Sequence, residues 1–250
     1  MGCPDCRDAG TGRGAPYVRF VHLVLIPGLL CDPDLWSHQT SHLADIAQIT
    51  VADITAGETV EALAAQVLAE APDKFALAGL SMGGYVGQAI MRLAPERVER
   101  LALLDTSGRA DTDDQRMRRS QLFDMSRIGK FRGVTDRLLP ILIHEDRLAD
   151  EDLTDRVKAM AERVGPEAFH RQQMAIMSRP DGRSDFAGYN IPVLVVCGRQ
   201  DALTPVALHE EMVDLIPGAK LAVIEDSGHL SSMERPQAAT ALLRQWLLYG

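Results

Sequence analysis

Short apolar runs alternate with amphipathic stretches along most of this chain, and that alternation limits the fold more than any other feature of the sequence. The apolar runs are rich in β-branched and large aliphatic residues and end at glycine, proline or polar residues, which is typical of buried strands. The stretches between them, such as Thr59–Glu70, repeat apolar residues at helical spacing. We expect Thr59 to cap this helix, and Thr204 to cap a later helix that begins at Pro205. This pattern predicts an α/β fold with a mostly parallel central β-sheet, flanked by helices and joined by right-handed crossovers. The runs that we interpret as strands are Phe20–Ile26, Ala47–Val51, Phe75–Ala78, Val98–Leu104, Val193–Cys197 and Lys220–Ile224.

One long segment interrupts the alternation. Between residues 109 and 186 no strand-like run occurs, and a helical pattern is broken at glycines and prolines. We interpret this segment as a helical cap, inserted after the strand that follows the helix Met82–Leu93. A chain of 250 residues suits one large α/β domain. The predicted organisation is therefore a flexible N-terminal tail at 1–18, a core made of 19–108 and 187–250, and the cap at 109–186.

Composition and charge argue against several classes of partner. Apolar residues make up 46% of the chain and charged residues 24%, the ordinary balance of a globular protein. The formal net charge of −9 repels polyanions, so nucleic acid is not an expected partner. No apolar run approaches the roughly 20 residues that cross a bilayer, and the N-terminus lacks the apolar core of a secretory signal. We expect no membrane association and a cytoplasmic location, and either a monomer or a homodimer.

Two residue pairs raise the question of a metal or redox site. Cys3 and Cys6 form a C-x-x-C pair in a glycine-rich tail, whereas the redox motif needs a strand-to-helix setting and zinc needs further ligands. His38 and His42 lie four residues apart, as in a metalloprotease helix, but Gln39 cannot act as the general base of that motif. We therefore predict no metal and no cofactor.

The pentapeptide Gly79-Leu80-Ser81-Met82-Gly83 carries the strongest chemical signal. This G-x-S-x-G directly follows a predicted strand and directly precedes a predicted helix. Its glycines leave room for a strained turn that would hold the Ser81 hydroxyl clear of the sheet. The positive end of the following helix would then lie beside negative charge that develops on a reacting oxygen. A phosphate-binding glycine loop is disfavoured because neither a lysine nor a G-x-G-x-x-G follows, so we predict Ser81 as a nucleophile.

A nucleophilic serine needs a base, and the base needs an orienting carboxylate. Asp201 lies in the loop after one predicted strand, and His229 lies in the loop after the next. Together with Ser81 they would stand at the carboxyl ends of parallel strands, where α/β sheets form their sites. Asp105, which ends another strand, is an alternative acid, and Asp226 is a weaker rival.

These motifs resemble the α/β-hydrolase family over almost the whole chain from Val21 onward, in which the triad follows the order Ser, Asp, His. The strand end Leu25-Ile26-Pro27-Gly28-Leu29-Leu30 resembles the oxyanion loop of that family. The resemblance implies that the backbone N–H groups of Leu29 and Met82 form the oxyanion hole. Many family members have histidine where this chain has Pro27. There is also no room for a full N-terminal hairpin, so the sheet is expected to have fewer strands than usual.

The resemblance implies a serine hydrolase that cleaves a small-molecule carboxylic ester or lactone through an acyl-enzyme intermediate. The same triad could serve a C–C bond hydrolase, a perhydrolase or an acyltransferase, or remain in a hydrolase-fold ligand receptor with vestigial turnover. The dehalogenase branch is disfavoured, because its nucleophile is aspartate where this chain has Ser81.

The predicted cap has two features that bear on the substrate. Its methionines would suit either an adaptable apolar pocket roof or the filling of gaps in a small helical core. Its arginines could hold a substrate carboxylate, as in family members that resemble enol-lactone hydrolases, or form a solvated face with acidic neighbours. The residues concerned are Met117, Met125, Met160, Met174 and Met177, and Arg116, Arg118, Arg119 and Arg127.

Overall fold

The predicted strands form one parallel sheet. The computed structural model describes residues 20–250, so the predicted tail at 1–18 and its Cys3–Cys6 pair lie outside the described residues. The strand order is β2-β1-β3-β4-β5-β6, and every neighbouring pair in that order is parallel, which confirms the predicted α/β fold. The strands are β1 (Val21–Ile26), β2 (Ala47–Val51), β3 (Phe75–Leu80), β4 (Val98–Leu104), β5 (Val193–Gly198) and β6 (Lys220–Ile224).

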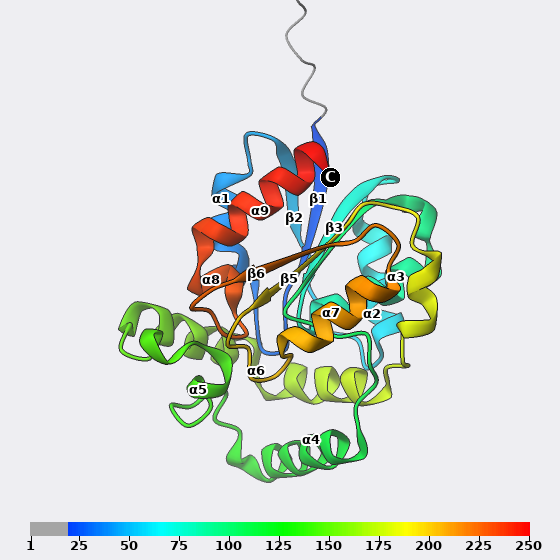
Figure 1. Cartoon of the computed structure of the whole chain (residues 1–250). Coiled ribbons are helices and arrows are strands. Elements are labelled where there is room, and N and C mark those ends of the chain that lie inside the picture. The colour runs from blue at the N-terminus through cyan, green and yellow to red at the C-terminus, as the bar shows by residue number, and fades with distance from the viewer. Residues whose placement is uncertain (1–19) are drawn as a thin grey trace, which may run out of the picture.

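Helices cover both faces of this sheet (Figure 1). Successive side chains of a strand point to opposite faces. In β1, Leu23 and Leu25 pack into one apolar cluster, whereas Val24 and Ile26 pack into another on the opposite face. Burial on both faces explains why the strands appear in the sequence as continuous apolar runs. One face carries α1 (Ser37–His42), α8 (Ser231–Glu234) and α9 (Pro236–Tyr249), and the other carries α2 (Val60–Glu70), α3 (Met82–Leu93) and α7 (Val206–Leu215).

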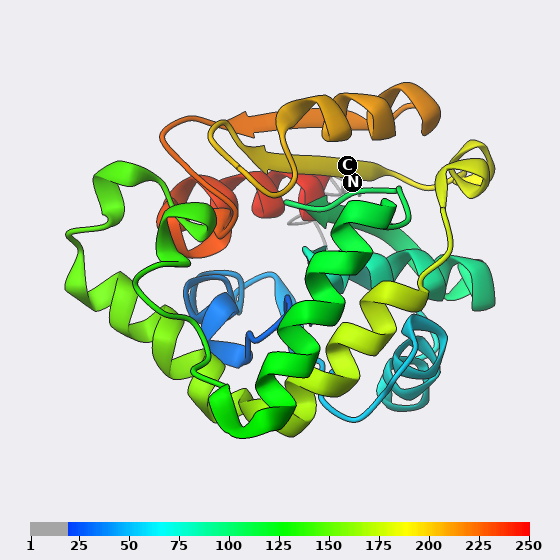
Figure 2. The same ribbon diagram turned by 90° about the horizontal axis from the view of Figure 1, so that it is seen from below.

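The segment between β4 and β5 covers the edge of the sheet at which the strands end (Figures 1 and 2). It contains helices and loops and no strand, in agreement with the expected cap, while the boundaries at 109 and 186 stay a prediction. The longest of its helices is interrupted at Gly165, where φ is 76°, directly before Pro166. The helices are α4 (Asp113–Met125), α5 (Leu139–Leu142) and α6 (Glu151–Ser178).

The cap is not held to the core uniformly. A capping box between Thr112 and Gln115 begins α4, yet α4 has no buried side chain. Met117 and Met125 on this helix are 56% and 53% exposed, whereas Met160 on α6 is fully buried. Gap-filling in a helical core therefore describes Met160 but not the methionines of α4. None of the helices in residues 20–250 combines the length and the apolar character needed to span a membrane.

The start of α7 differs from the sequence prediction. Thr59 caps α2 as expected, because its hydroxyl oxygen accepts a hydrogen bond from the Ala62 N–H at 3.1 Å. Thr204 was expected to cap the later helix with Pro205 as its first residue, but Pro205 is the cap residue and α7 begins at Val206. The Thr204 hydroxyl instead donates to the Asp201 carboxylate at 2.6 Å. The prediction for Thr204 was wrong because a nearby charged acceptor binds its hydroxyl in place of the helix end.

Gly198, the last residue of β5, lets two loops touch backbone to backbone. A Cβ added at this position would overlap with the carbonyl oxygens of Ser227 and Gly228. The loop that follows β5 and the loop that follows β6 are therefore in direct contact. Asp201 and His229 lie in these two loops, so the absence of a side chain at residue 198 brings both residues within reach of each other.

We predict that Gly198→Ala lowers the free energy of unfolding by about 1–3 kcal/mol, because the added methyl group forces the two loops apart. Gly188→Ala is the matched control, since a Cβ at residue 188 has no heavy atom within 4 Å. Urea unfolding followed by circular dichroism measures both variants. Equal stability of the two variants would contradict the close approach at Gly198.

Candidate active site

Ser81 stands on a strained turn between β3 and α3. Its φ of 56° and ψ of −116° lie in a region that non-glycine residues rarely adopt. A Cβ at Gly79 would overlap with the backbone of Gly83, and one at Gly83 would overlap with the carbonyl oxygens of Ile26 and Pro27. Both glycines of the pentapeptide are therefore required by close backbone packing, as the sequence motif predicted.

Hydrogen bonds from outside the turn hold this backbone in place. The Ser81 N–H donates to the Leu104 carbonyl at 2.9 Å, and the Ser81 carbonyl accepts from the Thr106 hydroxyl at 2.8 Å. The Thr106 N–H in turn donates to the Nε2 of His209 at 3.0 Å. His209 is fully buried, and burial lowers its pKa to about 4, so the ring stays a neutral acceptor. No motif around His209 predicts that it supports the turn.

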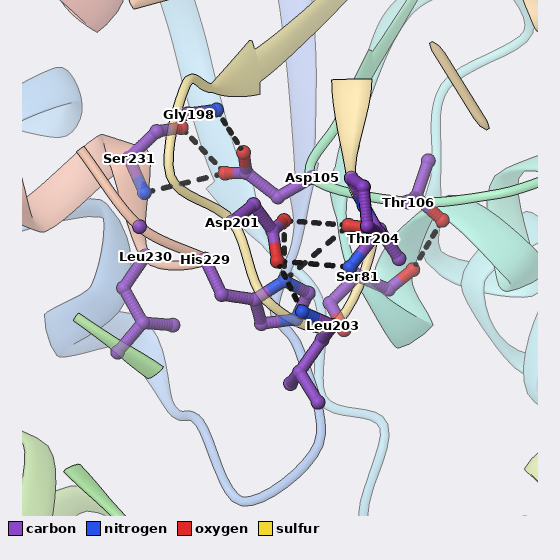
Figure 3. A network of polar contacts seen from close by, with 12 residues as sticks. Ser81, Asp105, Thr106, Gly198, Asp201, Leu203, Thr204, His229, Leu230 and Ser231 are labelled. Atoms are coloured by element: carbon purple, nitrogen blue, oxygen red, sulfur yellow. Dashed lines mark hydrogen bonds and ion pairs between the residues drawn. The ribbon is translucent and has the colours of Figure 1, made fainter. Parts of the chain in front are cut away.

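The three residues predicted as nucleophile, base and acid form a hydrogen-bonded row (Figure 3). The Ser81 Oγ lies 2.8 Å from the His229 Nε2, and the His229 Nδ1 lies 2.8 Å from the Asp201 Oδ2. His229 and Asp201 are each 4% exposed, while Ser81 is partly exposed. Three loops that are distant in the sequence thus bring a hydroxyl, an imidazole and a carboxylate together at the carboxyl edge of the sheet.

Further donors fix the Asp201 carboxylate. Its Oδ1 accepts from the N–H groups of Leu203 and Thr204 at 2.8 and 2.9 Å, and its Oδ2 accepts from the Thr204 hydroxyl. Burial raises the pKa of Asp201, but the nearby His229 and the hydrogen bonds outweigh burial and hold the pKa below its usual value. The carboxylate therefore carries its charge beside the imidazole at neutral pH.

Asp105 and Asp226, the alternative acids, are not the hydrogen-bond partners of His229. Asp105 is fully buried, and its carboxylate accepts from the Gly198 N–H at 2.9 Å and from the N–H and hydroxyl of Ser231 (Figure 3). It makes no hydrogen bond to His229. Burial and the neighbouring charge of Asp201 raise the pKa of Asp105 well above its usual value. The side chain of Asp226 is 64% exposed. The imidazole of His229 is bonded to Asp201 and to neither of the alternative acids.

The imidazole of His229 experiences two opposing effects. Burial lowers its pKa, whereas the charge and hydrogen bond of Asp201, helped by Asp105 and Glu234, raise the pKa by more. The pKa of His229 therefore lies above its usual value of 6.5. Above that pKa the ring is neutral and its Nε2 can accept a proton from the Ser81 hydroxyl.

Glu234, which was not predicted from the sequence, is a buried carboxylate that binds the loop of His229. Glu234 is 1% exposed, and it accepts from the N–H groups on either side of the histidine, those of Gly228 and Leu230. It also accepts from the N–H of His144, which belongs to the cap. Glu234 lies on the short helix α8, where nothing in the sequence distinguishes it from a surface glutamate.

The two predicted oxyanion donors belong to segments that adjoin Ser81. Met82 begins α3 directly after Ser81. Gly28 also packs against Ser81, since a Cβ added there would lie 3.4 Å from the Ser81 Cβ, and Leu29 follows Gly28. In residues 20–250 the N–H groups of Leu29 and Met82 have no hydrogen-bond acceptor. Their role as oxyanion donors stays a prediction.

The remaining histidines are engaged away from this row. The rings of His38 and His42 stack with centroids 3.9 Å apart, and His38 bonds to the Thr240 hydroxyl. Within residues 20–250, no group of three or more His, Cys, Asp or Glu side chains is arranged to hold a metal ion. The rings of His22, His144 and His170 form hydrogen bonds with the Thr50 hydroxyl, the Asp146 N–H and the Ser126 hydroxyl, respectively.

Comparisons with known proteins place this geometry in context. A model of the alpha/beta hydrolase fold matches residues 55–236. A pimeloyl-[acyl-carrier protein] methyl ester esterase of Aromatoleum aromaticum is 25% identical over 240 residues, covering 88% of this chain and 96% of that protein. An esterase structure from Thermogutta terrifontis has a TM-score of 0.83 and 28% identity, covering 91% of this chain and 89% of the other. The enol-lactonase of Burkholderia xenovorans has a TM-score of 0.84 and 25% identity, covering 94% of each chain.

We predict that the His229 imidazole titrates above pH 6.5, because the buried negative charge of Asp201 favours its protonated form. In Asp201→Asn that charge is removed while burial remains, so the pKa should fall below 6.5. Nuclear magnetic resonance of the imidazole C–H signals, assigned with a His229→Gln variant, measures both values. An unchanged pKa in Asp201→Asn would show that Asp201 does not set the charge of the ring.

Proposed function

Because the chain belongs to the α/β-hydrolase fold family, we propose that it is a carboxylic ester hydrolase that cleaves a small-molecule ester or lactone with Ser81, His229 and Asp201. The observation that carries this proposal is the hydrogen-bonded row, with 2.8 Å at each of its two contacts. Among the similar proteins, two are named esterases and a third is an enol-lactonase, which supports the same class of reaction.

The geometry suits acyl transfer in two halves. In the first, the Ser81 Oγ attacks the carbonyl carbon while the His229 Nε2 takes the hydroxyl proton, and the charged Asp201 stabilises the imidazolium. The oxyanion of the tetrahedral intermediate accepts hydrogen bonds from the N–H groups of Leu29 and Met82. His229 then returns the proton to the departing alkoxide, and the acyl group remains bound to Ser81.

In the second half a water molecule takes the place of the alcohol. His229 removes a proton from the water, and the resulting hydroxide attacks the acyl carbon of the Ser81 ester. The intermediate collapses, the proton returns to the Ser81 Oγ, and the carboxylic acid leaves. In a lactone the alkoxide and the acyl group belong to one molecule, so the product is a single hydroxy acid. The reaction therefore needs no reactant other than water and the ester or lactone, and both of its halves use Ser81 and His229.

The four cap arginines named from the sequence differ in whether their guanidinium groups are free to bind a substrate carboxylate. Arg119 is bonded to Asp111 at 2.8 Å and to the side chain of Gln173 at 3.2 Å, so its guanidinium is already used. Arg127 lies over the Phe123 ring at 5.8 Å. Arg116, Arg118 and Arg127 are exposed and form no ion pair within the described residues. Of the four arginines named from the sequence, Arg116, Arg118 and Arg127 are therefore the ones left to contact a substrate carboxylate.

We predict that Ser81→Ala lowers kcat for a p-nitrophenyl ester by at least about 1,000-fold, because no other hydroxyl of the described residues bonds to the His229 Nε2. Ser41→Ala is the control, since Ser41 is exposed on α1 and only donates to the Ser37 carbonyl. A panel of p-nitrophenyl esters of increasing acyl length, run beside simple lactones, measures steady-state turnover. Hydrolysis by Ser81→Ala at the wild-type rate would refute the proposal, and a single slow cycle in the wild type would indicate a receptor instead.

A further inference from the structure

The residue after the proposed oxyanion donor Leu29 has an unusual backbone conformation. Leu30 has a φ of 59°, a left-handed value that side chains with a Cβ rarely adopt without support from the surrounding structure. The turn is closed by a hydrogen bond from the Cys31 N–H to the Gly28 carbonyl at 3.1 Å. The position of the Leu29 N–H therefore depends on whatever keeps Leu30 in this conformation.

A glutamine from the cap supplies that support. Gln172 lies on α6, is fully buried, and its Oε1 accepts from the Leu30 N–H at 3.1 Å. Its Nε2 donates to the Ile54 carbonyl at 3.3 Å, so both ends of the amide are used and its orientation is set by the backbone around it. Without Gln172, the buried N–H of Leu30 would lose its acceptor, a state that folded proteins avoid by local rearrangement.

The rest of α6 holds the same loop. The Leu30 side chain packs with Ala161 and Phe169 in a small apolar cluster of the cap. Two arginines of α6 pair with the residues that follow: Arg163 with Asp32 at 2.5 Å and Arg156 with Asp34 at 2.7 Å. Apolar packing and ion pairs hold the loop, and Gln172 binds the backbone N–H of the strained residue Leu30.

We propose that Gln172 is a positioning residue, which holds the turn of residues 28–31 so that the Leu29 N–H stays directed at the oxyanion. This inference rests on the proposed function, because it assigns Gln172 a task in the reaction of Ser81. A displacement of about an ångström at an oxyanion donor weakens a contact that matters most in the transition state. Loss of Gln172 therefore lowers kcat more than it raises KM.

The test compares an ester with the thionoester of the same acid and alcohol. Sulfur is a weak hydrogen-bond acceptor, so the thionoester gains less from the oxyanion donors than the ester does. Gln172→Met keeps the approximate volume but removes both polar atoms. Gln173→Met is the matched control, because Gln173 is the neighbouring buried glutamine on α6 and bonds to Arg119 rather than to the loop.

In Gln172→Met we expect kcat for the ester to fall about tenfold to hundredfold, with KM within threefold, as for a weakened oxyanion donor. The thionoester should lose less than about threefold, and Gln173→Met should keep both rates. If the Met variant does not fold, Gln172→Asn, whose amide is one methylene too short to reach Leu30, is read by the same criteria.

Two outcomes overturn the inference while leaving the proposed function intact: a folded Gln172→Met that cleaves the ester at the wild-type rate, or equal losses on ester and thionoester. The second outcome would mean that Gln172 only stabilises the cap. An absence of Ser81-dependent turnover in the wild type is different, because that result removes the proposed function itself and the inference with it.

Discussion

The buried hydrogen bond between Asp201 and His229 is the contact on which the rest of the site depends. A charged carboxylate at 4% exposure is stable only because four donors face it: two backbone N–H groups, the Thr204 hydroxyl and the imidazole. Its charge raises the pKa of His229 and keeps one ring nitrogen protonated. The other ring nitrogen is then the acceptor that faces Ser81. Each neighbouring feature serves to keep these two loops at this separation.

Backbone contacts produce that separation more than side-chain packing does. Gly198 allows the loop after β5 to touch the loop after β6, and Glu234 binds the N–H groups on both sides of His229. Asp105 ties Gly198 to Ser231, so the end of β4 is joined to the same assembly. The site thus contains three buried carboxylates with separate tasks: Asp201 faces the imidazole, while Asp105 and Glu234 bind backbone.

The cap is part of the site and not only its cover. The backbone N–H of His229 donates to the carbonyl of Leu142 on α5, and the Glu234 carboxylate accepts from the backbone N–H of His144. On the other side of Ser81, Gln172 of α6 accepts from the N–H of Leu30. Cap residues therefore touch both the loop of the base and the proposed oxyanion loop. By contrast, α4 buries no side chain, so this part of the cap is packed less closely than α6.

The sequence was sufficient for the parts of the structure that follow from local patterns. Continuous apolar runs predicted the six strands, and the strand, elbow and helix around Ser81 follow from two glycines that close packing requires. The choice between Asp201 and Asp105 was not decidable in this way, because both acids end strands at the same edge of the sheet. Gln172 and Glu234 were missed for a related reason. Each binds backbone groups of a distant loop, and such partners leave no spacing in the sequence that could reveal them.

Labelling with a fluorophosphonate shows whether His229 activates the hydroxyl of Ser81 and of no other serine. This reagent phosphonylates a serine only when a base removes its proton and an oxyanion site receives the phosphoryl oxygen. Peptide mass spectrometry should find a single adduct on Ser81, absent from His229→Ala. An adduct on another residue, or an unlabelled Ser81 in folded protein, would show that His229 does not activate Ser81.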